Sequence, residues 1–307
     1  MQNERRTYSG RLLDVDFYPV YNDGRRLPTR APKTKPSSEE QQKKNDRRAK
    51  KNIVRLINAN FATGDIWATF TFDADHAPAD VGEARRLVYN YIRRVKSKRE
   101  KARKDAEGEL RALIAAVETA TKKQAARIRK RIDALKKTVR LMRRPFKYFI
   151  VIVEDEYKSG PKAGQKSYHF HAFITGGLPR EEMEAMWTAG TCNADAFRPE
   201  KFGPEAAARY VANNPRGSRR YSYSKNLEDP VVKDRKGSVT RRQVEKMCKE
   251  RVDDAAYWER RYPGCRFLRA YPRWNDFNKH WYLSVVMYRP GQDGKVPPWT
   301  VTDWGEF

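Results

Sequence analysis

The sequence predicts an α+β fold, in which helices pack on a central antiparallel sheet. The two segments 146–154 and 167–175 are strongly apolar and are separated by a polar loop, so they predict an antiparallel hairpin. The segment 66–72 is rich in β-branched and aromatic residues and lies between turn residues, which predicts a further strand. Apolar residues at helical spacing over 79–98 predict a helix that packs on the sheet. Helices that alternate with antiparallel strands are typical of this class.

The remaining elements are expected on both sides of these strands. We expect a polar, extended N-terminal arm over 1–46, because this stretch is rich in Arg, Lys and Pro, although a helix begins near its end and continues to Asn58. The main domain is expected over 47–290, followed by a C-terminal tail over 291–307. Further helices are expected over 178–187, 204–214 and 244–262, a loop with a short strand over 216–240, and strands near 265–274 and 280–289.

Residues 99–143 differ from their surroundings and predict an inserted basic helical hairpin. They are dense in Lys, Arg, Glu and Ala, and their apolar residues fall at heptad-like spacing in two short segments. A hairpin with its tip near Thr121 would return the chain to the sheet, whereas one long helix would carry it away, so we expect the hairpin. Its role is open between a basic clamp for DNA and a solvated coiled-coil insertion.

The charge balance indicates an anionic partner. The 307 residues include 65 Lys and Arg against 39 Asp and Glu, a formal net charge of +26. Nucleic acid is the first candidate and an anionic membrane surface the second. No apolar run is long enough to span a membrane, and the N-terminus lacks the apolar core of a signal peptide. Three cysteines without a CxxC spacing indicate a reduced, cytoplasmic protein without structural zinc.

A pair of histidines predicts a metal site. His169 and His171 are separated by one residue in a predicted strand, so their side chains project from the same face. The alternative is a chance pair of surface imidazoles. A third ligand is expected from the strand that precedes the pair, where Glu154 ends an apolar run and Glu156 follows as second choice. Two histidines and one carboxylate leave coordination positions open for a phosphate oxygen and water.

Tyr210 is the candidate nucleophile. It lies in an alanine-rich segment that predicts a helix ending before Pro215. A phenol is a poor nucleophile at neutral pH, and a nearby metal together with Arg209 would favour its phenolate form. A core tyrosine is the competing interpretation, and Tyr221 and Tyr223 are the next candidates. Further along the chain, Arg219, Arg220 and Tyr221 combine charge with an aromatic ring, as single-strand binding platforms do.

These features together resemble one family. The chain contains, in this order, the strand 66–72, a strand that ends in an acidic residue, the segment HFHAFI and a helix that carries a tyrosine. This order is similar to that of the HUH endonucleases. It is most similar to that of the rolling-circle replication-associated proteins of bacterial phages, plasmids and integrative elements. The resemblance covers about residues 45–290. It implies that His169, His171 and Glu154 hold Mg²⁺ or Mn²⁺ and that Tyr210 attacks the scissile phosphate.

The sequence departs from this family in two ways. Some members have a second tyrosine one helical turn away, and its absence here implies a single-tyrosine mechanism. Many members carry a lysine three or four residues after the tyrosine, where this chain has Asn213 and Asn214. Lys225 or Arg209 is the expected substitute for the missing positive charge.

The resemblance implies a replication initiator in the cytoplasm of a bacterial host. Such an enzyme nicks single-stranded or hairpin origin DNA, leaves a 5′-phosphotyrosine and a free 3′-hydroxyl, and later rejoins the ends. The resemblance implies a host helicase and a host polymerase as partners, and no membrane. Two alternatives are a single-tyrosine transposase or relaxase with the same chemistry, and a non-catalytic nucleic-acid-binding protein on the same fold.

Overall fold

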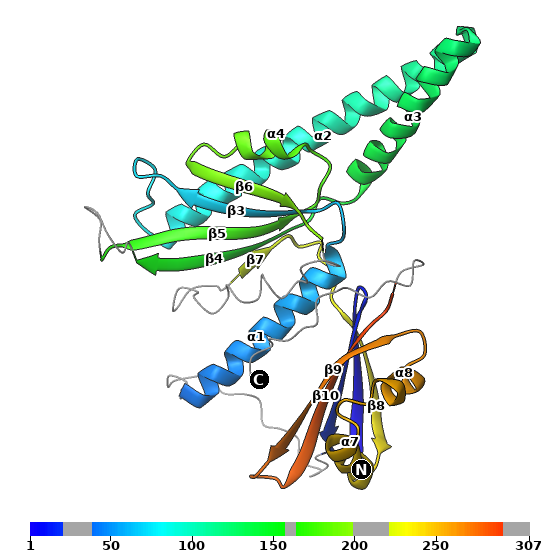
Figure 1. Cartoon of the computed structure of the whole chain (residues 1–307). Helices are drawn as coiled ribbons and strands as arrows, with labels where there is room; N and C mark the ends of the chain where they lie inside the picture. The colour runs from blue at the N-terminus through cyan, green and yellow to red at the C-terminus, as the bar shows by residue number, and fades with distance from the viewer. Residues whose placement is uncertain (21–38, 157–163, 199–220, 291–307) are drawn as a thin grey trace. The chain divides into compact units, whose positions relative to one another are not determined.

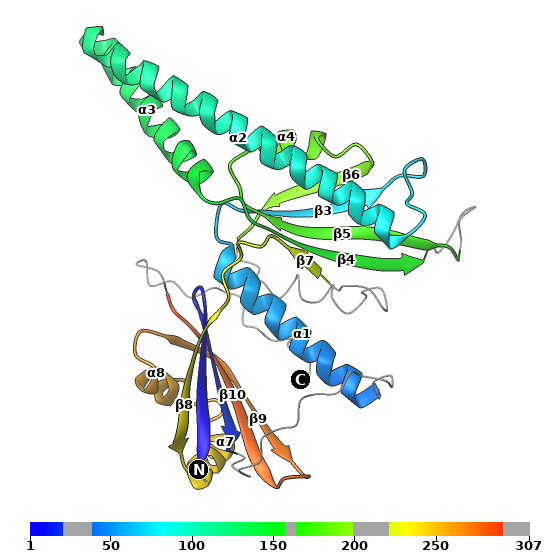
Figure 2. The ribbon, with the colours of Figure 1, turned by 180° about the vertical axis from the view of Figure 1, so that it is seen from behind.

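Two compact units make up the chain. The computed structural model describes residues 1–20, 39–156, 164–198 and 221–290. The first unit contains the described residues of 1–60 and 228–290, and the second those of 61–198 and 221–227. Each unit has one five-stranded sheet, and all of the strand pairs are antiparallel (Figures 1 and 2). The α+β class is therefore confirmed, but two sheets replace the one expected, and the range 47–290 contains parts of both units.

The sheet of the first unit has the strand order β8-β1-β2-β10-β9. Its strands are β1 (Gln2–Ser9), β2 (Leu12–Pro19), β8 (Val231–Val239), β9 (Arg266–Asn275) and β10 (His280–Tyr288). Helices α7 (Arg241–Glu250) and α8 (Ala255–Arg261) pack on one face through a core around Trp258 and Phe17. Helix α1 (Glu39–Asn60) packs on the other face, where Val54 joins a smaller apolar cluster.

Residues 2–19 form a β-hairpin, which differs from the extended arm expected over 1–46. Strands β1 and β2 pair in register from Gln2–Pro19 to Ser9–Leu12. The sequence of β1 is polar because its inward side chains are polar. Glu4 is only 1% exposed, and it accepts hydrogen bonds from Arg261 and Tyr262 of helix α8 and its C-terminal end. Residues far along the chain thus pair with the buried carboxylate of Glu4, which the local sequence pattern predicts to be exposed.

Helix α1 is attached to its sheet by ion pairs as well as by apolar contacts. Lys51 Nζ lies 2.8 Å from Asp16 Oδ1, and Arg55 Nε lies 2.6 Å from Asp14 Oδ2. The hydroxyl of Ser284 on β10 also donates to Asp16. Burial alone would raise the pKa of Asp16, but the charges of Lys51 and Arg55 outweigh it and lower this pKa to about 2.

The single helix expected over 244–262 is in fact two helices. Helix α7 ends at Glu250 and α8 begins at Ala255. Asp254 is the N-cap of α8, because its side chain accepts a hydrogen bond from the backbone N–H of Tyr257. An aspartate in this position stabilises a helix start and separates the two helices.

The sheet of the second unit has the strand order β6-β3-β5-β4-β7. Its strands are β3 (Ile66–Phe72), β4 (Tyr148–Glu156), β5 (Lys166–Ile174), β6 (Gly190–Ala196) and β7 (Tyr221–Tyr223). Helices α2 (Val81–Thr119) and α4 (Arg180–Ala185) cover one face of this sheet (Figure 2). The core between them contains the rings of Phe70, Tyr91, Phe170 and Trp187. The three strands expected over 66–72, 146–154 and 167–175 are confirmed, with small shifts at their ends.

Helices α2 and α3 (Lys122–Arg143) form the expected hairpin, and its tip lies at Ala120 and Thr121. The hairpin projects beyond the sheet in both ribbon views (Figures 1 and 2). At its base, the buried guanidinium of Arg99 donates to the carbonyls of Gly176, Leu141 and Arg144. No helix in the described ranges has the length and apolar character needed to cross a membrane.

Candidate functional site

The two histidines lie at the centre of the second sheet. Strand β5 pairs with β3 on one side and with β4 on the other. His171 lies opposite Thr69 and Val151, and His169 lies opposite Thr71 and Val153. Because opposed residues in an antiparallel sheet share a face, these side chains form two neighbouring rows.

The histidine face is the one that α2 and α4 do not cover. The alternate residues of β5, Tyr168, Phe170 and Ala172, point to the other side and belong to the core beneath these helices. The alternation HFHAF therefore separates two functions. Phe170 and Ala172 hold the sheet to α2, and His169 and His171 project from the opposite face.

His171 is held rigidly. It is 4% exposed, and its ring stacks on the indole of Trp67 with the ring centres 5.2 Å apart and the planes 7° apart. Its Nδ1 lies 3.1 Å from the hydroxyl of Thr69, within hydrogen-bond distance. Burial, with a smaller contribution from His169, lowers the pKa of His171 to about 4. The imidazole is therefore neutral at pH 7, the form in which histidine binds metals.

His169 is more accessible, and its side chain is 24% exposed. Its ring meets that of His171 edge-on, with 5.2 Å between ring centres. Its Nδ1 lies 3.4 Å from Oδ2 of Asp155 on β4. Burial lowers the pKa of His169, and the negative charge of Asp155 acts in the opposite direction. A carboxylate beside Nδ1 favours a proton on that nitrogen, which leaves the lone pair on Nε2.

The structure does not bring Glu154 to the histidines. Glu154 lies opposite Tyr168, and Glu156 lies opposite Lys166, so both belong to the face that α2 covers. The carboxylate of Glu154 is 2.8 Å from the Lys166 ammonium instead. Asp155 lies between the two glutamates and shares the histidine face. Of the three acids at the end of β4, Asp155 is therefore the one beside the imidazoles, because neighbouring residues in a strand point in opposite directions.

The structure brings together two of the three residues expected as metal ligands. His169 and His171 offer two neutral imidazoles on one face, and each Nδ1 has a neighbouring oxygen, from Asp155 and Thr69 respectively. In metal sites, oxygens that hydrogen-bond to the second ring nitrogen orient histidine ligands in this way. Within the described ranges, no three His, Cys, Asp or Glu side chains converge closely enough to hold an ion. A divalent ion at the imidazole pair would therefore need water or substrate oxygens as its remaining ligands.

Tyr221 lies in the same row as His171. Val151 is opposite His171 on one side and opposite Tyr221 of β7 on the other. Two strand spacings separate the two backbones, about 10 Å. The ring of Tyr221 is half-buried and stacks on Phe149 with ring centres 5.2 Å apart. Tyr223 stacks on the same phenylalanine and is more exposed.

Four of the predicted site residues lie outside the described residues: Tyr210, Arg209, Arg219 and Arg220. Their expected roles stay predictions. Lys225, the expected substitute for a family lysine, is exposed just after β7.

Three further residues on the histidine face are absent from the sequence-based prediction. Trp67, Asp155 and Asn193 all lie on this face, and Asn193 extends the row of His171 and Thr69 onto β6. The alternation in IWATFTF was enough to place Trp67 and Thr69 on one face. Strand β6, with the sequence GTCNADA, has almost no apolar signal, so Asn193 was not detectable in this way.

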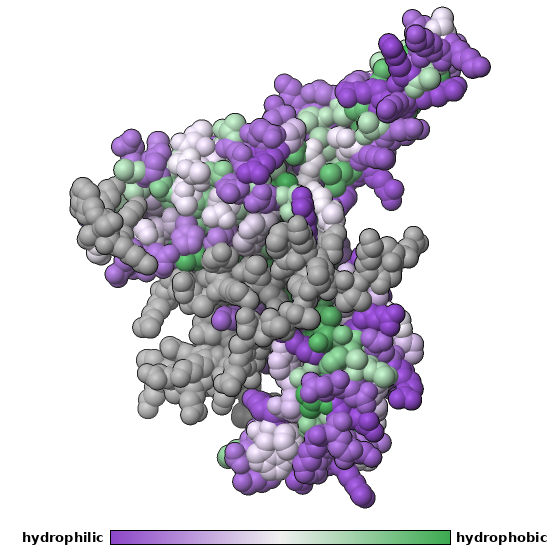
Figure 3. All heavy atoms as spheres, viewed as in Figure 1, coloured by the Kyte–Doolittle hydropathy of each residue, from purple (hydrophilic) through white to green (hydrophobic). Residues whose placement is uncertain are grey.

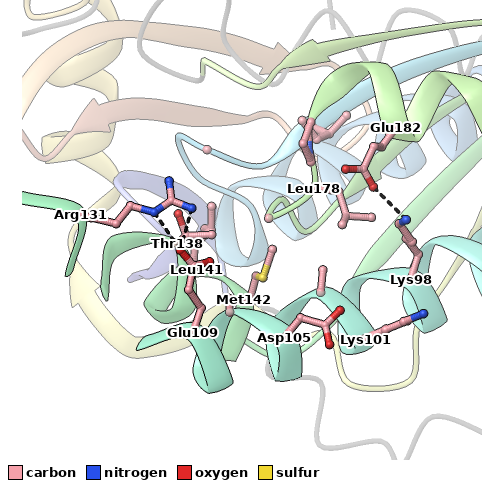
Figure 4. A pocket seen from close by; sticks show the side chains of 16 residues that line it. Lys98, Lys101, Asp105, Glu109, Arg131, Thr138, Leu141, Met142, Leu178 and Glu182 are labelled. Atoms are coloured by element: carbon pink, nitrogen blue, oxygen red, sulfur yellow. Dashed lines mark hydrogen bonds and ion pairs between the residues drawn. The ribbon is translucent and has the colours of Figure 1, made fainter. Parts of the chain in front are cut away.

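A cavity of about 810 Å³ lies elsewhere in this unit, at the root of the hairpin, between α2, α3 and the segment that leads into α4 (Figure 4). Two ion pairs lie on its wall. Lys98 is 3.3 Å from Glu182, and Arg131 is 2.9 Å from Glu109. Lys101 and Asp105 also line this cavity.

Comparisons of the chain with family models, with curated proteins and with solved structures found no match.

Proposed function

We propose that the second unit nicks single-stranded DNA by metal-assisted attack of a tyrosine, as an HUH-type replication initiator does. The observation that supports this most directly is the pair of neutral imidazoles on the central strand, on the face opposite the helices. A structural role for buried histidines would not require both rings to share a face with their Nδ1 atoms beside oxygens. The net charge of +26 favours the same class of substrate.

His169 and His171 would hold a divalent Mg²⁺ or Mn²⁺ ion, while Asp155 and Thr69 keep their rings in place. A bound ion of this kind offsets negative charge that develops on a phosphate. The phenolic oxygen of Tyr210 attacks the phosphorus and loses its proton to solvent. The bond to the 3′ oxygen breaks, and that oxygen takes up a proton. The products are a 5′-phosphotyrosine and a free 3′-hydroxyl, and the reverse attack rejoins the ends.

Trapping the covalent intermediate tests this proposal. The full chain is incubated with Mn²⁺ and labelled single-stranded DNA from its own replicon, and a denaturing gel shows whether label stays on the protein. Tyr210→Phe is expected to abolish the adduct, and His169→Ala is expected to abolish it or reduce it at least tenfold. If the adduct survives Tyr210→Phe but not Tyr221→Phe, Tyr221 is the nucleophile. No adduct with any divalent metal would refute the nicking activity.

A matched pair of variants tests the role of the carboxylate. Asp155→Asn is expected to weaken Mn²⁺ binding about tenfold or more, because it removes the charge beside Nδ1 of His169. Glu154→Gln removes a neighbouring charge on the other face, so Mn²⁺ affinity should change less than twofold. Titration calorimetry measures both. A larger loss with Glu154→Gln than with Asp155→Asn would contradict the assignment of faces.

A non-catalytic DNA-binding protein is the second candidate. The observation in its favour is that the described residues complete only two of three metal ligands. In that case, Mn²⁺ would have no measurable affinity for the wild-type chain, and His169→Ala would leave DNA binding unchanged.

A further inference from the structure

The two helices of the projecting hairpin carry very different charges. Helix α3 has ten Lys and Arg residues and a single acid, Asp133. The facing part of α2, residues 100–119, has four basic and five acidic residues. An insertion that serves only as a solvated support has no need to concentrate its positive charge on one helix. The difference therefore calls for a separate explanation.

Acidic residues outnumber basic ones on the facing part of α2, whereas α3 has ten basic residues and one acid. Arg103 on α2 pairs with Glu100 and Glu107 of its own helix. On α3, Arg131 and Arg143 pair with Glu109 and Glu107 of α2. The other eight cations of α3 are exposed and form no ion pair in the described structure. They are Lys122, Lys123, Arg127, Arg129, Lys130, Lys136, Lys137 and Arg140.

Three of these cations lie in one straight row. Ile132, Leu135 and Val139 form the buried seam of α3 against α2. Lys123, Lys130 and Lys137 repeat every seven residues, which is two turns, so they share the opposite side of the helix. From Lys123 to Lys137, this row is about 21 Å long, the length of about six base pairs of duplex. Figure 3 shows mainly hydrophilic atoms over the far end of the hairpin.

The chemistry of this surface selects one kind of partner. Helix α3 contains no aromatic residue, so it lacks the stacking rings that hold single strands. Its apolar residues face α2, so it has no second apolar face to enter a membrane. A straight, rigid row of cations matches the straight, rigid phosphate backbone of a double helix.

We infer that the outer face of α3 binds the phosphate backbone of duplex DNA next to the single strand that the histidine site cuts. The inference rests on the proposed function for the identity of this DNA as the substrate. The histidine face would act on the single strand, and the hairpin would hold an adjoining double-stranded stem. Binding on α3 is independent of base sequence, since the contacts are with phosphates.

Two triple variants of the full chain test this inference. Lys123→Gln, Lys130→Gln and Lys137→Gln together remove three charges from the outer face of α3. The control combines Lys101→Gln, Lys104→Gln and Arg111→Gln, which remove three exposed charges from α2. Fluorescence anisotropy measures binding of a labelled 20-base-pair duplex, of one of its strands, and of vesicles with 30% phosphatidylserine. All buffers contain EDTA and from 50 to 200 mM NaCl, and circular dichroism compares the folded helix content of the variants.

The α3 variant is expected to bind the duplex at least tenfold more weakly at 50 mM NaCl. Its slope of log affinity against log salt concentration should be smaller by about 2.7, from about 0.9 for each lost phosphate contact. The control should change duplex affinity less than threefold, and the α3 variant should keep most of its single-strand affinity.

Three results would overturn the inference: equal duplex losses in the two variants, a single-strand loss as large as the duplex loss, or a loss confined to the vesicles. Duplex binding in EDTA needs neither metal nor tyrosine. A chain that never forms the adduct can therefore still confirm the duplex surface, and a chain that nicks can still fail this test.

Discussion

Replacement of Asp16 by asparagine is expected to destabilise the first unit by about 2 kcal/mol at pH 7. The Asp16 side chain is 23% exposed and contacts Lys51 and Arg55 of α1 and Ser284 of β10. Its pKa of about 2 lies below the ordinary value of 3.8. At about 1.4 kcal/mol for each pKa unit, the ionised form contributes about 2 to 2.5 kcal/mol to folding. Asparagine removes that charge and keeps the size of the side chain.

The pH dependence has a definite sign. A carboxylate whose pKa is lowered in the folded state contributes its full stabilisation above about pH 5. The contribution is lost as the pH falls from 3.8 through about 2, where the folded protein also takes up the proton. The difference between wild type and Asp16→Asn should therefore be largest at neutral pH and small near pH 2.

Hydrogen exchange measured by mass spectrometry gives the stability of this unit alone, from peptides of β2 and β10. Asp234→Asn is the control, because Asp234 is 36% exposed and forms a surface pair with Arg5. Surface pairs contribute at most about 1 kcal/mol. An Asp16→Asn effect below that of Asp234→Asn, or one that is unchanged between pH 7 and pH 2.5, would refute the reasoning.

Three further predictions concern the second unit and the thiols. Arg99→Leu should lower the free energy of unfolding by about 3 kcal/mol, because three carbonyls at the hairpin base lose their donor. Hydrogen exchange in β5 should then accelerate, and unchanged exchange would contradict this. Gly176→Ala should lower the melting temperature in calorimetry, because the new Cβ would lie 1.9 Å from the carbonyl oxygen of Gly64. An unchanged melting temperature would show that the backbone moves to make room for the Cβ. Burial raises the pKa of Cys192 and of Cys248 to about 12, so iodoacetamide at pH 8 should modify both slowly in the folded chain and rapidly in urea, and fast labelling of the folded chain would contradict their burial.

Strands and helices with a clear apolar period were predictable from the sequence. The segment IWATFTF became β3 with the expected bounds, and the hairpin tip falls at Thr121 as expected. The period identifies these elements because each has one face against an apolar core. Strand β1 was missed because its inward residues are polar, and Glu4 is paired by residues more than 250 positions away. No local pattern contains that information.

The candidate site was predictable in part. The same-face arrangement of His169 and His171 follows from alternation along one strand and needs no partner. The choice of carboxylate depends instead on which residue of β4 lies opposite each residue of β5, and a shift of one residue exchanges the faces. The register pairs Glu154 with Tyr168, so the acid at the end of the apolar run is on the wrong side for the histidines, and Asp155 is on theirs.

The anchoring of the hairpin at Arg99 has a consequence for how the chain can vary. Because one guanidinium joins α2 to the C-terminal end of α3, the incoming and outgoing chains are fixed side by side where they meet the sheet. Beyond Arg99, α2 and α3 contact mainly each other, through a repeating apolar seam. Whole heptads could therefore be removed from or added to both arms, and relatives of this chain could differ widely in arm length while their sheets superpose.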